Sequence, residues 1–259
     1  MIDTHVHYDH MNFNEIREHL LEECQKNGIK WVVNAAIGFE TNYTMREKLD
    51  KYPWIYYGIG IHPDRVGLPD PETDALWEEK IRTMTTAPRV VAIGETGLDY
   101  HHGKDDLITE HQIYWFRKLL SIADENNLPL ILHIREADLD AIEILKEYPL
   151  KDSGVVHCFN SGWNVAHFYL QKGLYLGLGG AITYPEKAEL RDAVQKIPLE
   201  RILLETDAPY VKLVNCQSTL NTSLELPKVV QAICELKGLS KEEVIQATTE
   251  NAKLLFRIR

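Results

Sequence analysis

The sequence is poor in cysteine and lacks long apolar runs, and both absences limit the class of protein. The four cysteines, Cys24, Cys158, Cys216 and Cys234, have no CxxC spacing and no framework pattern, so we expect reduced thiols rather than a disulfide-stabilised secreted domain. No apolar run approaches the ~18 to 20 residues needed to span a bilayer. The first residues also lack the basic and apolar regions of a signal peptide. We therefore expect a cytoplasmic protein that does not bind membranes.

Positive charge is also scarce. The chain has 28 Lys and Arg residues against 39 Asp and Glu residues, which gives a formal net charge of −11. This balance argues against a protein that coats nucleic acid through a broad basic surface. It does not exclude an enzyme that binds a few phosphates locally. Nothing in the sequence implies an obligate protein partner.

Short apolar runs alternate with longer segments of helical periodicity along the whole chain. The runs are rich in Ile, Val and Leu, as expected for parallel strands covered on both faces. They are residues 2–6, 31–36, 55–61, 90–94, 130–134, 154–159, 174–178 and 202–205. Helical periodicity is found in residues 13–26, 41–51, 73–86, 107–126, 139–147, 164–172, 186–196 and 224–236. Ser240 begins a capping box for a last helix, which we expect to run through Thr249.

The strict alternation of strand and helix predicts a parallel sheet. The 259 residues are close to the roughly 250 of a typical (β/α)8 TIM barrel. Eight strands in a chain of this length predict a single-domain α/β barrel over residues 1–259. A doubly wound open sheet could also hold eight strands, but no GxGxxG loop follows any expected strand, which disfavours a nucleotide-binding open sheet.

Histidine and acidic residues occur at the ends of the expected strands. His5 and His7 are two residues apart at the end of the first run, so an extended backbone points both side chains to the same face. Further potential ligands end or follow four later runs: Glu95, His133, His157 and Asp207. The C-terminal ends of barrel strands meet at one rim, where active sites are built. Six potential ligands from five strands would therefore surround one hollow.

Each of these residues has a simpler explanation when it is taken alone. An isolated histidine near a strand end is usually a hydrogen-bonded core or rim residue, and a carboxylate there can cap a turn. The joint arrangement is hard to explain by packing, because several buried imidazoles and carboxylates without partners would be costly. Metal ions would satisfy all of them together, so the pattern predicts a metal centre.

The ligand types favour zinc, manganese or magnesium. Six ligands exceed the number that one ion needs when a position stays open for water. We therefore expect two divalent ions, ~3.5–4 Å apart, that share Glu95 as a bridge. One ion would be held by His5, His7, Glu95 and Asp207, and the other by Glu95, His133 and His157. Such a pair activates water and polarises a substrate oxygen, and Asp207 can take the proton from the attacking water.

An ordered set of motifs runs from one end of the chain to the other. Its members are residues 3–7 (DTHVH), 60–63 (GIHP), 94–100 (GETGLDY), 128–137 (LPLILHIREA), 157–159 (HCF) and 204–210 (LETDAPY), with Gln112 and Phe116. The set resembles that of the TatD family of metal-dependent hydrolases, a branch of the amidohydrolase-like barrels. The resemblance implies the barrel fold and the ligand partition given above. It also implies metal-dependent hydrolysis of DNA phosphodiesters, described as exonucleolytic.

Two further residues are candidates for substrate binding. The resemblance implies that His62 faces the substrate phosphate; alternatively, its side chain caps the turn that follows it. Arg135 lies two residues past His133 on the same side, where it could bind an anion or form a salt bridge with a neighbouring carboxylate. We expect Asp99 to order the turn after Glu95.

The chain departs from the family after its last metal motif. Relatives usually carry an Arg-rich stretch that leads to Asn-Glu-Pro, whereas Asn221 lacks both the preceding arginine and the following Glu-Pro. The missing positive charge weakens the case for a long polyanionic substrate more than the case for hydrolysis.

These observations favour a metal-dependent phosphodiesterase. The leading hypothesis is a deoxyribonuclease of exonuclease type that acts on DNA ends or another phosphodiester, with Asp207 and Glu95 as catalytic residues. An amidohydrolase-like esterase or amidase is the alternative, because the same ions and the same base also serve reactions at a carbonyl. A barrel that keeps its metals and acts only as a binding module is the third hypothesis.

Overall fold

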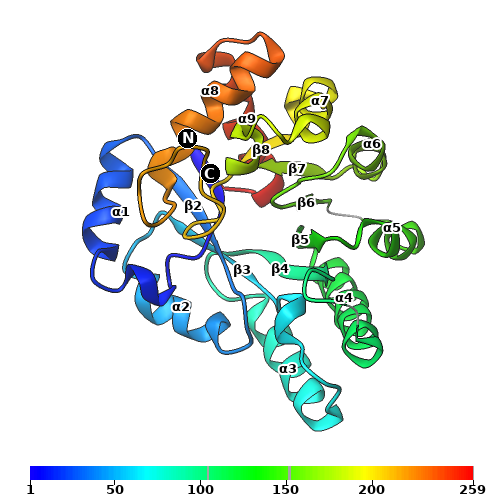
Figure 1. Cartoon of the computed structure of the whole chain (residues 1–259). Helices are drawn as coiled ribbons and strands as arrows, with labels where there is room; N and C mark the ends of the chain where they lie inside the picture. The colour runs from blue at the N-terminus through cyan, green and yellow to red at the C-terminus, as the bar shows by residue number, and fades with distance from the viewer. Residues whose placement is uncertain (104, 151–152, 259) are drawn as a thin grey trace.

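The computed structural model describes residues 1–103, 105–150 and 153–258. Within this part of the chain, eight parallel strands form one sheet whose spatial order follows the sequence. They are β1 (Ile2–Val6), β2 (Trp31–Ala35), β3 (Ile55–Ile59), β4 (Val90–Asp99), β5 (Leu130–Arg135), β6 (Gly154–Val156), β7 (Tyr175–Leu178) and β8 (Ile202–Leu204). Figure 1 shows the strands at the centre with the helices around them. The predicted (β/α)8 barrel is confirmed.

The barrel closes between β8 and β1 through a few backbone contacts. Val6 and Ala208 form an isolated parallel bridge. The N–H of Asp207 donates to the carbonyl oxygen of His5 (2.9 Å), and the N–H of His7 donates to that of Ala208 (2.8 Å). The closure therefore places His5, His7 and Asp207 beside one another.

Helices cover the outside and one end of the barrel. They are α1 (Arg17–Lys26), α2 (Thr41–Leu49), α3 (Pro71–Met84), α4 (Asp106–Asn126), α5 (Asp138–Glu147), α6 (Trp163–Gln171), α7 (Ala188–Lys196), α8 (Leu226–Lys237) and α9 (Lys241–Phe256). Buried residues recur at helical spacing, as Trp115, Leu119 and Ile122 do on α4, because an amphipathic helix covers the strands with one face. The capping box at Ser240 is present, with Glu243 as its second member. None of the described helices is both long enough and apolar enough to cross a membrane.

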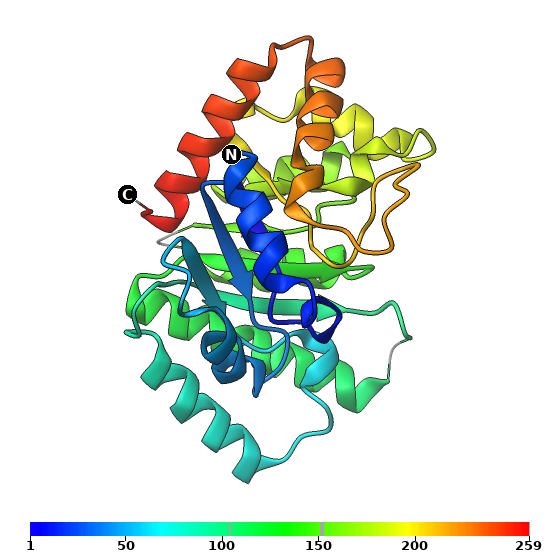
Figure 2. The same cartoon turned by 90° about the vertical axis from the view of Figure 1, so that its left-hand side faces the viewer.

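The last helix is longer than predicted, because α9 continues to Phe256 instead of ending at Thr249. Its Ala252, Leu255 and Phe256 belong to a separate apolar cluster with strand residues that include Ile2, Val33, Ala92, Ile131, Val155 and Leu203. Figure 2 shows α9 at the end of the barrel where the strands begin. The helix therefore closes the bottom of the barrel, away from the C-terminal ends of the strands.

Three other boundaries differ from the prediction by more than two residues. β4 continues to Asp99 instead of ending at Gly94, because a register shift after residue 93 lets residues 96–99 pair with β5. β6 is shorter than predicted and ends at Val156. The first helix begins at Arg17, since residues 11–13 form a separate 3₁₀ turn. Of these, the longer β4 matters most, because it places Glu95 inside a strand.

Candidate metal centre

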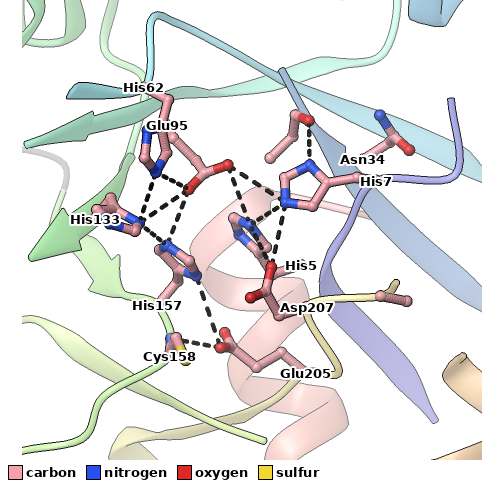
Figure 3. A network of polar contacts seen from close by, with 12 residues as sticks. His5, His7, Asn34, His62, Glu95, His133, His157, Cys158, Glu205 and Asp207 are labelled. Carbon is pink, nitrogen blue, oxygen red and sulfur yellow. Dashed lines mark hydrogen bonds and ion pairs between the residues drawn. The ribbon is translucent and has the colours of Figure 1, made fainter. Parts of the chain in front are cut away.

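The structure brings the six predicted ligands together at the C-terminal ends of the strands (Figure 3). His5 lies within β1, Glu95 within β4 and His133 within β5. The other three follow β1, β6 and β8 within three residues and are His7, His157 and Asp207. Even the most exposed of the six side chains, that of His133, has only 15% of its surface exposed. Charged groups this far from water need a partner of opposite charge.

One group of donor atoms lies on one side of Glu95. The Nε2 atoms of His5 and His7 are 3.2 Å apart, and His7 Nε2 lies 3.2 Å from Asp207 Oδ1. Glu95 Oε1 lies 3.5 Å from His5 Nε2 and 3.4 Å from His7 Nε2. Four donor atoms from three strand ends therefore converge on one small volume.

The other carboxylate oxygen of Glu95 faces a second group. Oε2 lies 3.0 Å from His157 Nε2 and 3.3 Å from His133 Nδ1, and these two nitrogens are 2.9 Å apart. His62 Nε2 joins the group at 3.2 Å from His133 Nδ1. Figure 3 shows Glu95 between the two groups, with one oxygen toward each.

Contacts outside the cluster determine which nitrogen of a histidine faces it. His7 Nδ1 lies 2.9 Å from the carbonyl oxygen of Ala35, and His133 Nε2 lies 2.9 Å from Asp99 Oδ2. Because each of these nitrogens donates a proton, the other nitrogen of the neutral ring is the one that faces the cluster and would ligate a metal ion. Asp99 also accepts the N–H of His101 (2.9 Å). It therefore orders its turn and orients His133, and the second of these roles was not predicted from the sequence.

The pKa values of the clustered residues are shifted in different directions. Burial and the neighbouring His157 lower the pKa of His5 to about 4. Burial also opposes protonation of His7, but the hydrogen bond to Asp207 and the charge of Glu95 raise its pKa to about 9. Burial alone would raise the pKa of Glu95, yet the charges of His5 and His157 hold it well below its usual range. Glu95 is therefore ionised and attracts a cation that the imidazoles can also ligate.

The donor set fits metal ions on two counts. Glu95 Oε1 is buried and has no hydrogen-bond partner among the described residues, although two imidazole nitrogens face it. Donor atoms within 4.8 Å of one another include the set His5, His7 and Glu95 and the set His62, Glu95 and His133. Imidazole combined with carboxylate is a donor combination that suits zinc and manganese. A cation beside Glu95 Oε1 would satisfy an atom that the described residues leave without a hydrogen-bond partner.

Glu205 is a buried acid at this site whose role was missed in the sequence. It is 1% exposed, and its Oε1 accepts the N–H of Cys158 and lies 3.9 Å from His157 Nδ1. Gly177 leaves the space that the carboxyl group fills, since a Cβ there would overlap Glu205. Burial and the charge of Asp207 raise the pKa of Glu205 well above its usual range. The missed signal was an acidic residue at the end of a wholly apolar strand, where it must be buried.

His62 caps the turn that follows it, which was one of the two roles considered for it. Its Nδ1 accepts the N–H of Asp64 (3.1 Å) and so caps the 3₁₀ turn Pro63–Arg65, while Nε2 faces the cluster. Arg135, the last residue of β5, is exposed and lines the cavity above the cluster. It forms no ion pair with the residues that the structure describes. Its guanidinium group is therefore available to an anion.

The cluster lies in a cavity of about 730 Å³, a volume in the range of small-molecule and cofactor sites. Two tyrosines and four cationic side chains line the cavity walls, together with two acids outside the cluster; they are Tyr184, Tyr210, Arg65, Arg135, Lys187, Lys212, Asp64 and Glu186. Cationic walls above a cluster of metal-binding donors suit an anionic substrate that is attacked by water.

A (β/α)8 barrel with histidines and carboxylates gathered at the C-terminal ends of its strands defines a metal-dependent hydrolase. The comparison with known families makes the assignment specific. The family model described as "TatD related DNase" matches residues 2–257, and the chain belongs to this family.

Relatives match the chain over its whole length. The Bacillus subtilis (strain 168) protein YabD, named an uncharacterized metal-dependent hydrolase, is 34% identical over 262 residues, which cover 100% of this chain and 99% of the relative. The crystal structure of YjjV, a TatD homolog from Escherichia coli K12, superposes with a TM-score of 0.91 at 32% identity and covers 100% of this chain and 98% of that one. A hydrolase of the TatD family from Entamoeba histolytica superposes with a TM-score of 0.81 at 22% identity, over 99% and 97% of the two chains. The predicted family is confirmed.

Proposed function

We propose that this protein is a metal-dependent phosphodiesterase, specifically a deoxyribonuclease of exonuclease type that acts on DNA ends. The main support is the position of Glu95, which presents one carboxylate oxygen to each of two imidazole groups. This arrangement favours a dinuclear centre of zinc, manganese or magnesium. In this proposal His5, His7, Glu95 and Asp207 hold one ion, and Glu95, His133 and His157 hold the other.

The metals and the chain contribute different parts of the reaction. When bound, the two ions lower the pKa of a coordinated water and polarise a phosphoryl oxygen. Burial opposes ionisation of Asp207, but the hydrogen bond with His7 lowers its pKa, so its carboxylate is ready to accept the proton that the attacking water loses.

His62 and Arg135 bind the substrate phosphate in this mechanism. Because His62 Nδ1 accepts the N–H of Asp64, the neutral ring carries its proton on Nε2, which faces the cluster and would donate to a phosphate oxygen held there. Burial and the charge of His133 lower the pKa of His62 to about 3, so this neutral form prevails. Arg135 supplies a permanent positive charge and a fork of N–H donors that match phosphate oxygens.

The cavity walls favour a phosphodiester over a neutral carbonyl substrate. Four cationic side chains line the cavity of a protein whose formal net charge is −11. A neutral ester or amide gains little from these charges, whereas the successive phosphates of a nucleic acid are attracted by them.

The test is digestion of end-labelled single- and double-stranded DNA by metal-free and metal-loaded protein, with metal content measured in parallel. We expect mononucleotide release only from the metal-loaded protein. Replacement of His62 or Arg135 by Ala should reduce cleavage of DNA and of bis(p-nitrophenyl) phosphate about tenfold, the loss of roughly one hydrogen bond to a charged group. Arg117→Ala, which removes a half-buried arginine that pairs with Glu147 away from the cavity, is the matched control and should have no effect.

Two results would contradict the proposal, and each would favour a different function. Hydrolysis of carboxylic esters or amides without cleavage of any phosphodiester would indicate the esterase or amidase alternative. Bound metal without turnover of DNA, RNA, phosphoesters or amides would indicate a binding module.

A further inference from the structure

Two lysines form a cationic group on the part of the cavity wall that follows β7 and β8. Lys187 and Lys212 line the same cavity as Asp207, whereas Arg65 and Arg135 enter it after β3 and at the end of β5. Because the strands follow one another around the barrel, the lysines and the arginines approach the metal cluster from different sides.

Hydrogen bonds hold the backbone of both lysines in place. The N–H of Lys187 donates to the carbonyl oxygen of Tyr184 (3.1 Å). The hydroxyl of Tyr184 in turn donates to the carbonyl oxygen of Lys212 (2.9 Å). The N–H of Val214 donates to Thr183 Oγ1 (2.9 Å). The loops after β7 and β8 are therefore joined, and together they place both lysines in the lining of the cavity.

The charges of these lysines are not balanced by ion pairs. Both residues are exposed, and neither forms an ion pair with a carboxylate in the described part of the chain. Glu186 lines the same wall, which therefore has two positive side chains and one negative. Several exposed lysines on the helices do form such pairs, as Lys26 does with Glu23 (2.9 Å) and Lys196 with Asp192 (2.7 Å). Unpaired lysines in a cavity of this acidic protein are explained by an anion that comes from outside.

We infer that Lys187 and Lys212 form a second anion subsite, which binds a substrate phosphate other than the one that is cleaved. The inference rests on the proposed phosphodiesterase activity, in which the scissile phosphate lies at the metal cluster beside Asp207. An ammonium group is a compact point charge that binds a terminal phosphate without demanding bidentate geometry. The favoured substrate is therefore a short oligonucleotide with a terminal phosphate, rather than an isolated diester.

The test compares hydrolysis of the dinucleotides TpT, pTpT and TpTp by the metal-loaded protein, with bis(p-nitrophenyl) phosphate as a diester that has no second phosphate. For the wild type we expect one phosphorylated dinucleotide to have a KM about tenfold below that of TpT. The double variant Lys187→Ala, Lys212→Ala should raise that KM about tenfold, an effect within reach of two exposed ion pairs. Its kcat, and its KM for TpT and bis(p-nitrophenyl) phosphate, should stay within about twofold of wild type.

Two control variants separate local from general charge effects. Lys26→Ala removes an exposed lysine that pairs with Glu23 on α1 and should change none of these values. Glu186→Gln removes the acid from the wall and should lower the KM of the phosphorylated dinucleotide. A double variant that raises the KM of all substrates alike, or of none, would overturn the subsite.

A second measurement tests the subsite by binding alone, independently of catalysis. If the wild type cleaves none of the diesters, the proposed function fails, and calorimetric titration with thymidine 3′,5′-bisphosphate decides the subsite. Its affinity should fall about tenfold in the double variant and remain unchanged in Lys26→Ala. Equal affinity in all three proteins would overturn the subsite independently of catalysis.

Discussion

At the scale of single residues, the site depends on histidines whose orientation is fixed by hydrogen bonds to groups outside the cluster. The carbonyl oxygen of Ala35 and the carboxylate of Asp99 each hold one ring nitrogen of a histidine, so that the other nitrogen faces the cluster. Glu95 is oriented within the cluster itself, because an imidazole nitrogen lies near each of its carboxylate oxygens. Two predictions concern these residues.

Glu95→Ala should abolish hydrolysis and lower the metal content from about two ions per chain to about one, because both proposed ions use this carboxylate. Elemental analysis of the purified variant measures the metal content, and DNA digestion measures the activity. Full metal occupancy in the variant would contradict the bridging role.

Asp99→Asn should weaken metal binding about 10- to 100-fold, because an amide no longer holds the Nε2 proton of His133 as a carboxylate does. Competition with a chelator measures the affinity. The fold should be retained, since Asn can still accept the N–H of His101, and circular dichroism checks this. Unchanged metal affinity would show that Asp99 only orders its turn.

At the scale of secondary-structure elements, the two ends of the barrel have different functions. The C-terminal ends of the strands carry the metal-binding cluster, while α9 fills the opposite end with apolar side chains. The side chain of Phe256 is almost fully buried there, at 2% exposure, whereas Leu254 on the same helix is 71% exposed. The helix should therefore contribute to stability through one face only.

Phe256→Ala should lower the free energy of unfolding by about 3–5 kcal/mol, because it removes a large buried side chain and leaves a cavity. Leu254→Ala is the matched control and should change it by less than about 0.5 kcal/mol. Denaturant unfolding monitored by tryptophan fluorescence measures both. Similar losses for the two variants would show that α9 does not close the barrel as described.

At the scale of the whole molecule, a negative net charge coexists with four cationic side chains that line the cavity above the cluster. The acidic surface repels a polyanion, so nucleic acid should bind only through the few cations that line the cavity. Below these cations, buried carboxylates lie beside histidines in the cluster, and bound metal ions would stabilise the charge of the carboxylates. Two predictions follow from these charges.

DNA binding should depend only moderately on salt. With at most four cavity cations in contact with phosphates, the slope of log K against log salt should be no steeper than about −3, since each neutralised phosphate of a single strand contributes about −0.7. Fluorescence anisotropy with a short labelled single strand measures the slope. A much steeper slope would mean that DNA lies across a wider basic surface.

Removal of the metals should lower the thermal stability. A ligand that binds only the folded state at 1,000 times its dissociation constant adds about 4 kcal/mol of stability. Calorimetry with and without a chelator measures the shift, and restoring the metal should reverse it. An identical melting temperature in both states would argue against a buried metal centre.

The periodicity of the sequence was sufficient to predict the eight strands, their alternation with helices and the barrel, because each apolar run needs cover on both faces. His5 and His7 could be placed on one side of a strand because strand side chains alternate. The motif order identified the family. These are local properties, which neighbouring residues determine.

Tertiary structure alone decided the remaining features. Asp99 lies near His133 only because β4 continues beyond Gly94 and pairs with β5, and Glu205 contacts Cys158 only where Gly177 leaves space. The length of α9 depends on the open end of the barrel that it fills. In each case the partner is distant in sequence, so local periodicity carries no information about it. The sequence determined which groups could ligate metal and bind phosphate, and the closure of the barrel decided which atoms of those groups face one another.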